Sequence, residues 1–175
     1  MKKLLQFGRL RSQEKKERGP QPVLAVLPGI GLGPLRFGMS QEDIEGILGK
    51  AEDLHLMDHD SVHLYYPGRG ITLFLDREED WRLSGIEINS RCRCTLFSQD
   101  IFSMSRGEIE ALLAAQPSRE HRPPEPVLQL EVDGTTSLES RNLAMTFYFE
   151  GAKRLVEINW GLWVNAADEV VWPTE

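Results

Sequence analysis

Three histidines at regular spacing are the residues of this chain best suited to metal chemistry. His55, His59 and His63 recur every four residues, with aspartates between them. On a helix or one extended strand this spacing would keep the imidazoles together, and imidazole with carboxylate groups can bind zinc. The segment 53–66 instead favours strand–turn–strand, which spreads the histidines around a hairpin. We therefore predict surface histidines and no metal site, with a metal site as the alternative.

A glycine-rich run and an acidic run are two further patterns that could carry chemistry. The run 29–33 reads Gly-Ile-Gly-Leu-Gly, but it lacks the Lys-Ser/Thr of a phosphate-binding P-loop. Pro34 follows where a dinucleotide-binding helix would begin, so we expect a tight turn. The acids at 78–80 precede Trp81 in an expected hairpin, and this pattern indicates a solvated surface.

No arrangement of nucleophiles indicates an enzyme. Ser, Cys and His occur, but in no recognisable catalytic motif. Cys92 and Cys94 are one residue apart, so a disulfide between them would be strained, and no second cysteine pair exists to complete a metal site. We predict structural thiols, no catalytic residues and no cofactor. A small hydrolase or metal-dependent enzyme is the least favoured alternative.

Two matching segments predict two helices that begin in the same way. Residues 37–48 match residues 102–113 at an offset of 65. Each match holds a serine N-cap followed three residues later by an acid, which is the pattern of a capping box. The positions concerned are Ser40 with Asp43 and Ser105 with Glu108.

Apolar residues around each cap predict which helical face is buried. Each N-cap is preceded by a methionine, and an isoleucine follows at the N4 position, which together form a hydrophobic staple. Gly49 ends the first helix and Pro117 limits the second. The predicted buried faces are Ile44, Ile47 and Leu48 in the first helix, and Ile109, Leu112 and Leu113 in the second.

Matching strands follow each helix. Residues 71–76 match 145–150 at an offset of 74, and residues 86–89 match 156–159 at an offset of 70. Their alternation of apolar and polar residues predicts strands with one buried face. We expect further strands around 62–66 and 127–132. The predicted core positions are Ile71, Leu73, Leu75, Ile86 and Ile88, with Met145, Phe147, Phe149, Val156 and Ile158 as their counterparts.

The predicted fold class is therefore α+β, as a tandem duplication of a helix-plus-antiparallel-sheet unit. The boundaries that we predict are a basic tail at 1–20, a first repeat at 21–95, a second repeat at 96–165 and a C-terminal tail at 166–175. Residues 90–101 are expected to join the repeats, and residues 117–126 to form a loop. The two sheets are expected either to stay separate or to continue across the junction.

The motif order resembles a known group of bacterial proteins. Gly38-Met39-Ser40, the helix end Ile47-Leu48-Gly49 and the paired strands resemble the β-lactamase-inhibitor-protein-like layout, which is shared with the SmpA/OmlA lipoproteins. The resemblance covers roughly residues 30–160 and implies a tandem α+β fold and an inhibitor-like role. Those relatives are exported, whereas residues 1–20 show no signal-peptide pattern or lipoprotein cysteine. We therefore expect a cytoplasmic protein, in the manner of bacterial immunity proteins.

The charge distribution indicates the kind of partner. Residues 1–20 hold seven Lys and Arg against two Glu, a net charge of +5, so the other residues carry −12 of the total of −7. An acidic body repels nucleic acid and attracts a basic protein. The tail is expected to be mobile, and membrane contact by the tail is the alternative.

The outward side of the predicted sheet holds the candidate binding residues. Phe74 and Tyr148 occupy matched positions there and are flanked by acids and amides, a composition typical of interface centres. The predicted partner-binding residues are Phe74, Tyr148, Glu87, Asn89, Glu157 and Asn159. The alternative is that the two aromatics pack the repeats together.

These patterns favour a non-enzymatic protein-binding module. We expect an inhibitor or immunity-type protein that sequesters a partner with a basic contact surface, because charge complementarity orients such encounters. The alternative is a scaffold or assembly component that docks through its basic tail. Deleting residues 1–20 distinguishes the two, since only docking needs the tail.

Overall fold

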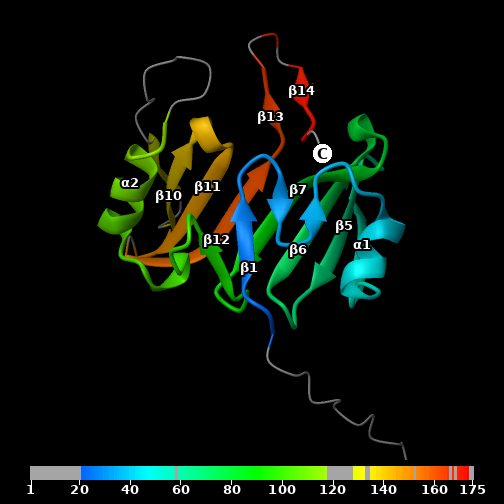
Figure 1. Cartoon of the computed structure of the whole chain (residues 1–175), viewed down its shortest axis with the longest axis horizontal. Coiled ribbons are helices and arrows are strands. Elements are labelled where there is room, and N and C mark those ends of the chain that lie inside the picture. The colour runs from blue at the N-terminus through cyan, green and yellow to red at the C-terminus, as the bar shows by residue number, and fades with distance from the viewer. Residues whose placement is uncertain are drawn as a thin grey trace, which may run out of the picture.

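A computed structural model describes residues 21–57, 59–117, 128–132, 135–151, 153–165, 167 and 169–173. It shows an α+β fold built on an eight-stranded antiparallel sheet in the order β4-β5-β6-β7-β12-β11-β10-β9 (Figure 1). The strands of this sheet are β4 (Asp53–Met57), β5 (Ser61–Tyr66), β6 (Ile71–Asp76), β7 (Arg82–Asn89), β9 (Leu128–Val132), β10 (Thr135–Ser140), β11 (Met145–Glu150) and β12 (Arg154–Gly161).

The two halves of the chain share this one sheet. β7 pairs with β12 in an antiparallel ladder that places Ile88 opposite Ile158. The strands of the first half therefore continue directly into those of the second, which was one of the two expected arrangements. A sheet joined in this way presents one long core face and one long opposite face.

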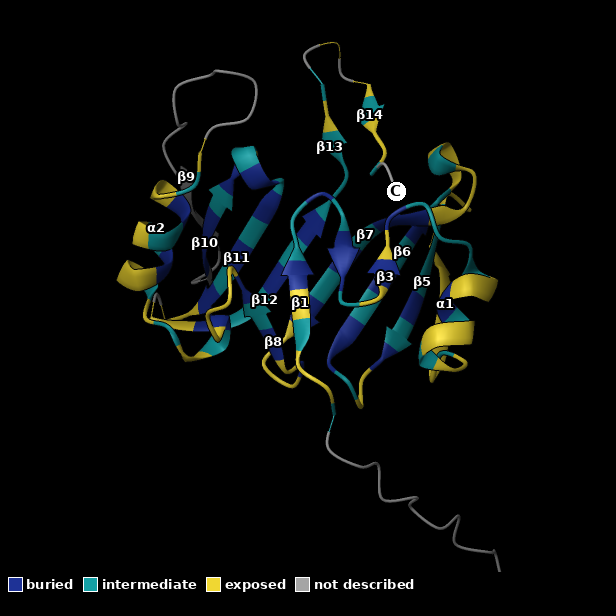
Figure 2. Ribbon diagram, viewed as in Figure 1, coloured by how far each residue is buried: buried dark blue, intermediate teal, exposed yellow. Residues whose placement is uncertain are grey.

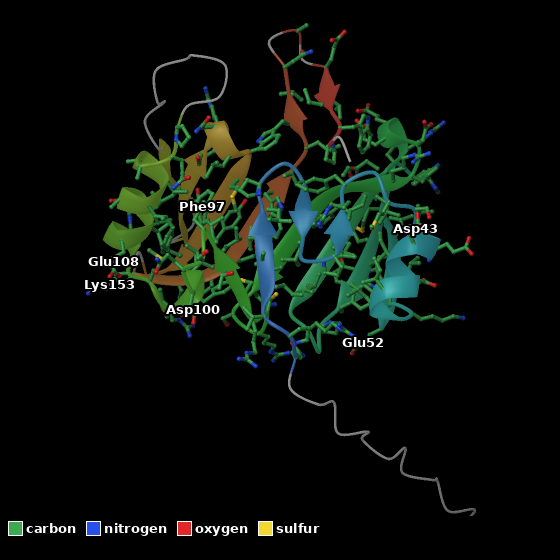
Figure 3. All side chains as sticks on the ribbon, in the orientation of Figure 1. Asp43, Glu52, Phe97, Asp100, Glu108 and Lys153 are labelled. Carbon is green, nitrogen blue, oxygen red and sulfur yellow. The ribbon has the colours of Figure 1, made fainter. Side chains whose placement is uncertain are left out.

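Both helices begin at the predicted serines. Helix α1 (Gln41–Leu48) is capped by Ser40 and helix α2 (Arg106–Ala114) by Ser105, and in each the capping box is complete in both directions. Figure 3 labels the two box acids, Asp43 and Glu108, on opposite flanks of the molecule. Because an N-cap satisfies backbone N–H groups that have no partner within the helix, each cap sets where its helix begins.

The buried faces of the helices agree with the pattern in part. Ile44 and Ile109 have no exposed surface, and Leu113 is buried as predicted. Ile47 differs, because 39% of its surface is exposed. Leu48 and Leu112 are half-buried and pack against the core, so Ile47 is the one predicted helical core residue that does not.

A second, smaller sheet was not predicted. It has the order β3-β2-β1-β8 and lies on the same face of the large sheet as the two helices (Figure 1). Its strands are β1 (Leu24–Leu27), β2 (Gly31–Leu32), β3 (Leu35–Arg36) and β8 (Cys94–Leu96). Strand β8 comes from the expected joining segment and pairs in parallel with β1. Strands of two to four residues are too short for alternation to reveal them.

The glycine-rich run supplies residues to two tight turns, as expected of a turn region: Gly29 lies in the turn between β1 and β2, and Gly33 in the turn between β2 and β3. A Cβ on Gly31 would lie 2.0 Å from the carbonyl oxygen of Leu35, so no side chain fits where β2 and β3 approach. Gly29 has a positive φ, and the ring of Trp163 lies where its Cβ would be. The run therefore serves close packing, which only glycine allows here.

One continuous core lies between the large sheet and the layer that covers it. In Figure 2 the central strands β6, β7, β11 and β12 carry buried and intermediate residues in turn along most of their length. Every predicted core position is buried except Val156, which is only half-buried. Cys92 and Cys94 are free thiols within this core.

The C-terminal residues form a hairpin where a tail was predicted. Strand β13 (Trp163–Val164) pairs with β14 (Val170–Val171). The following Trp172 lies against the loop before α1, where a Cβ on Gly38 would be 3.2 Å from its ring. The sequence suggested a tail because the two strands have only two residues each.

The strand ladders differ from the sequence predictions in two further ways: they include one strand that was not predicted, and they change the offset between matched strands. Strand β10 was not predicted, because Leu138 is the only large apolar residue in it. Strand β6 pairs Ile71 with Ile88, and β11 pairs Met145 with Trp160, so the partner strands correspond at an offset of 72 and not 70. Side chains keep their predicted faces except at the register shift of β12, where Leu155 is buried opposite Phe149 in place of the predicted Val156. The tail at 1–20 lies outside the described residues, as does nearly all of the loop at 117–126.

Candidate partner-binding face

The side of the large sheet that points away from the helices holds the predicted binding residues. We call it the outer face, and its central residues are Thr72, Phe74, Glu87, Asn89, Thr146, Tyr148, Glu157 and Asn159. All of them are half-buried except Asn89, which is exposed. Alternation along the strands places them there, because their neighbours in sequence are core residues.

The central ladder brings the predicted polar residues together. Glu87 lies directly opposite Asn159, and Asn89 lies directly opposite Glu157. The two carboxylates therefore sit diagonally across the β7–β12 ladder, each facing an amide. Such diagonal neighbours are about 7–8 Å apart, close enough for their charges to interact.

The surroundings of this cluster raise the pKa of its acids. Burial and the neighbouring charge of Glu157 raise the pKa of Glu87, although a hydrogen bond from Thr72 opposes the shift. Burial also raises the pKa of Glu157. Burial and the charges of Glu157, Glu87 and Glu139 raise the pKa of Tyr148. Among the described residues, no Lys or Arg lies within ion-pair distance of Glu87 or Glu157.

We expect Glu87→Gln to raise the melting temperature at neutral pH. Because the folded pKa of Glu87 lies above its ordinary value of 4.5, the native state binds more protons than the unfolded state. This group therefore contributes stability below about pH 4.5 that is lost as pH rises through the folded pKa. Glutamine keeps the shape but has no charge to bury. Thermal melts from about pH 4 to about pH 8 measure the difference between the two proteins.

The difference between the two melting curves isolates Glu87. Asp43 and Glu108 have pKa values lowered by their Ser40 and Ser105 caps, so they give stability that rises with pH, but equally in both proteins. Glu45→Gln on α1 is the control for removing one negative charge elsewhere. Parallel curves for wild type and Glu87→Gln would contradict the predicted role of burial.

The two aromatics have different surroundings. Phe74 lies opposite Gly85, where a Cβ would be 3.1 Å from the Phe74 ring, and its ring meets that of His63 edge-on at 4.6 Å. Tyr148 lies opposite Glu157. Strands β7 and β12 lie between Phe74 and Tyr148, which puts the two rings three strand spacings or about 14 Å apart across the sheet. The registers also set them four residues apart along the strands, since Phe74 is level with Gly161 and Tyr148 with Glu157. The aromatics therefore do not pack against each other.

Two of the histidines are closer together than the hairpin interpretation implied. Residues 53–66 form strand–turn–strand as predicted, but His55 lies directly opposite His63 on the outer face. The ring of Tyr65 is 5.1 Å from that of His55, and burial lowers the pKa of His63. His59 lies in the turn. The described residues contain no group of three or more His, Cys, Asp or Glu arranged to hold a metal ion.

Sequence reasoning missed Gly85 as part of this face. Its partner across the junction is Gly161, so two glycines meet at the centre of the sheet. An isolated glycine in an alternating strand is the signal that could have found them, because it often marks a close approach of other groups. Here the Phe74 ring covers Gly85, which fixes the position of that aromatic on the outer face.

Comparison of the chain with protein-family models, curated proteins and solved structures found no match. Among the described residues, no helix has the length and apolar character needed to cross a membrane.

Proposed function

We propose that this chain is a non-enzymatic protein-binding module of the inhibitor or immunity type. In this proposal its outer face sequesters a partner with a basic contact surface. The observation that carries the proposal is the pair Glu87 and Glu157, half-buried acids with no described cation within ion-pair distance. A lysine or arginine of a partner would relieve their repulsion while it orients the complex.

Several features support the further proposal of a tandem duplication. Each half supplies a helix with a complete capping box and four adjacent strands of the sheet. The ladder of β6 with β7 shifts register between Phe74 and Leu75, and that of β11 with β12 shifts between Tyr148 and Phe149. These two bulges fall at matched positions. A β-lactamase-inhibitor-protein-like layout is part of the same proposal, as are a bacterial origin and a cytoplasmic location.

The test replaces both acids in the double variant Glu87→Gln/Glu157→Gln. Full-length protein immobilised on a sensor should capture a basic protein from native-host extract, and the double variant should associate with it more slowly at low salt. High salt should remove the difference, because it screens electrostatic steering. The matched control Glu45→Gln/Glu52→Gln removes the same charge away from the outer face. Recovery of no stable partner, or of acidic partners alone, would contradict the proposal.

The alternative function, docking through the basic tail, is supported by the charge of +5 on residues 1–20. Protein beginning at residue 21 separates the two. Sequestering through the outer face should survive the truncation, whereas docking should be lost.

A further inference from the structure

A large cleft lies beside α1, away from the outer face. Its volume is about 1190 Å³. Five parts of the chain form its walls: the turn between β1 and β2, β3, α1 with the loop before it, the 3-10 helix η1 (Arg77–Glu79) with the residues after it, and the segment after β14. None of its lining residues belongs to the central cluster of the outer face, so the cleft is a separate surface.

The cleft has an exposed apolar lining. Ile47 is 39% exposed and Trp172 is 37% exposed, and both line the cleft. The glycine at position 46 leaves a gap in the wall beside Ile47, since a Cβ there would meet no atom within 4 Å. Ile47 on the helix and Trp172 near the C-terminus thus supply apolar surface from two distant parts of the chain.

Negative charge dominates the rim of this lining. Five acids line the cleft against two arginines; the acids are Glu42, Asp43, Glu78, Glu79 and Asp80. Both arginines are engaged with backbone carbonyl oxygens, since Arg82 donates to Gly38 at 3.1 Å and Arg36 donates to Leu35 at 2.9 Å. Among the described residues, no ion pair involves any of the five acids.

The acidic surface continues beyond the cleft. A second hollow of about 450 Å³ shares Glu78 and Glu79 with it and adds Asp60 and Asp76. A single metal ion or small amine would contact only a fraction of so long a surface. An extended segment with alternating cationic and apolar side chains matches both its charge and its apolar lining.

We propose that the cleft binds a basic, partly apolar peptide segment of a partner protein. The apolar side chains of the segment contact Ile47 and Trp172, and its Lys or Arg side chains lie against Glu78, Glu79 and Asp80. This site does not depend on the outer face, and it extends the contact that a basic partner makes with the acidic body.

Two helical glycines provide a matched test. Gly46→Leu fills the gap in the cleft wall, whereas Gly107→Leu makes the same change on α2, where a Cβ also meets no atom within 4 Å. The probe is a peptide of sequence Arg-Leu-Lys-Leu-Arg-NH2 that carries fluorescein at its N-terminus, and the full chain is titrated into it while its anisotropy is followed. We expect Gly46→Leu to weaken binding at least about tenfold and Gly107→Leu to leave it unchanged. Equal affinity for the two variants would overturn the proposal.

A second variant avoids any dependence on α1. The variant Glu78→Gln/Glu79→Gln should lower the affinity for the probe peptide about three- to tenfold at low salt. The loss should be smaller at high salt, because salt screens the charges. The peptide Arg-Ser-Lys-Ser-Arg-NH2 with the same label should bind more weakly than the leucine probe, because it lacks apolar side chains. Equal binding of the serine peptide would contradict the apolar part of the site. Circular dichroism melts establish that each variant is folded.

Other occupants of the cleft give different results. If sedimentation shows a dimer and Gly46→Leu abolishes it, the cleft binds a second copy of the chain, and the proposal is overturned.

Replacing the seven Lys and Arg of residues 1–20 with Gln should not change the affinity for the probe peptide. A large gain in affinity would assign the cleft to the chain's own tail. Glu87→Gln/Glu157→Gln should leave probe binding intact, which distinguishes failure of the outer face from failure of the cleft.

Discussion

Replacing Ile158 with alanine is expected to lower the free energy of unfolding of the whole chain by about 3 kcal/mol, in a single transition. Ile158 has no exposed surface and lies on β12 between Ile88 of β7 and Phe147 of β11. Truncation leaves a cavity where the two halves of the sheet join. Because one core spans both halves, we expect them to unfold together.

Urea unfolding followed by circular dichroism and by tryptophan fluorescence measures this effect. Val156→Ala is the control on the same strand, since Val156 is half-buried and should cost about 1 kcal/mol or less. A double-mutant cycle with Ile88→Ala should give a coupling energy of about 0.5 kcal/mol or more across the junction. Separate transitions for the two probes would show that the halves fold independently.

Truncating either outer-face aromatic is expected to cost about 2 kcal/mol or more in partner affinity, which is roughly thirtyfold. Phe74 and Tyr148 lie half-buried on the outer face, where a partner could bury them fully. Their effects on stability should differ. Phe74→Ala uncovers Gly85 and removes the ring contact with His63, which should cost about 1 kcal/mol of folding stability. Tyr148→Ala should cost less, because its directly opposite neighbour is the carboxyl group of Glu157 and not a glycine that the ring covers.

Binding kinetics and thermal melts on the two variants separate these effects. Phe97→Ala is the matched control, because Phe97 is an aromatic that is 38% exposed and lies between β8 and the 3-10 helix η2 (Ile101–Ser103), not on the outer face (Figure 3). It should leave affinity unchanged. Lower melting temperatures with unchanged affinity for both Phe74→Ala and Tyr148→Ala would mean that the aromatics stabilise the fold and do not bind a partner.

The features that the sequence predicted well are local ones. A capping box needs only a serine and an acid three residues apart, so Ser40 and Ser105 could be recognised without knowing the rest of the fold. Alternation along 71–76 and 145–150 likewise assigned Phe74 and Tyr148 to the face opposite the core, because neighbouring side chains on a strand point to opposite sides.

Only the tertiary structure decided which distant segments meet. The pairing of β7 with β12, the parallel pairing of β8 with β1, and the diagonal placement of Glu87 and Glu157 depend on ladders between residues far apart in the sequence. Strands of two to four residues are too short to carry a periodic signal, so the small sheet and the C-terminal hairpin were not predictable from alternation. The cleft depends on the same packing, since Ile47 and Trp172 are separated by most of the chain. Capping and alternation act over a few residues and are written in the sequence itself, whereas register and cleft shape arise from packing the whole chain around one core.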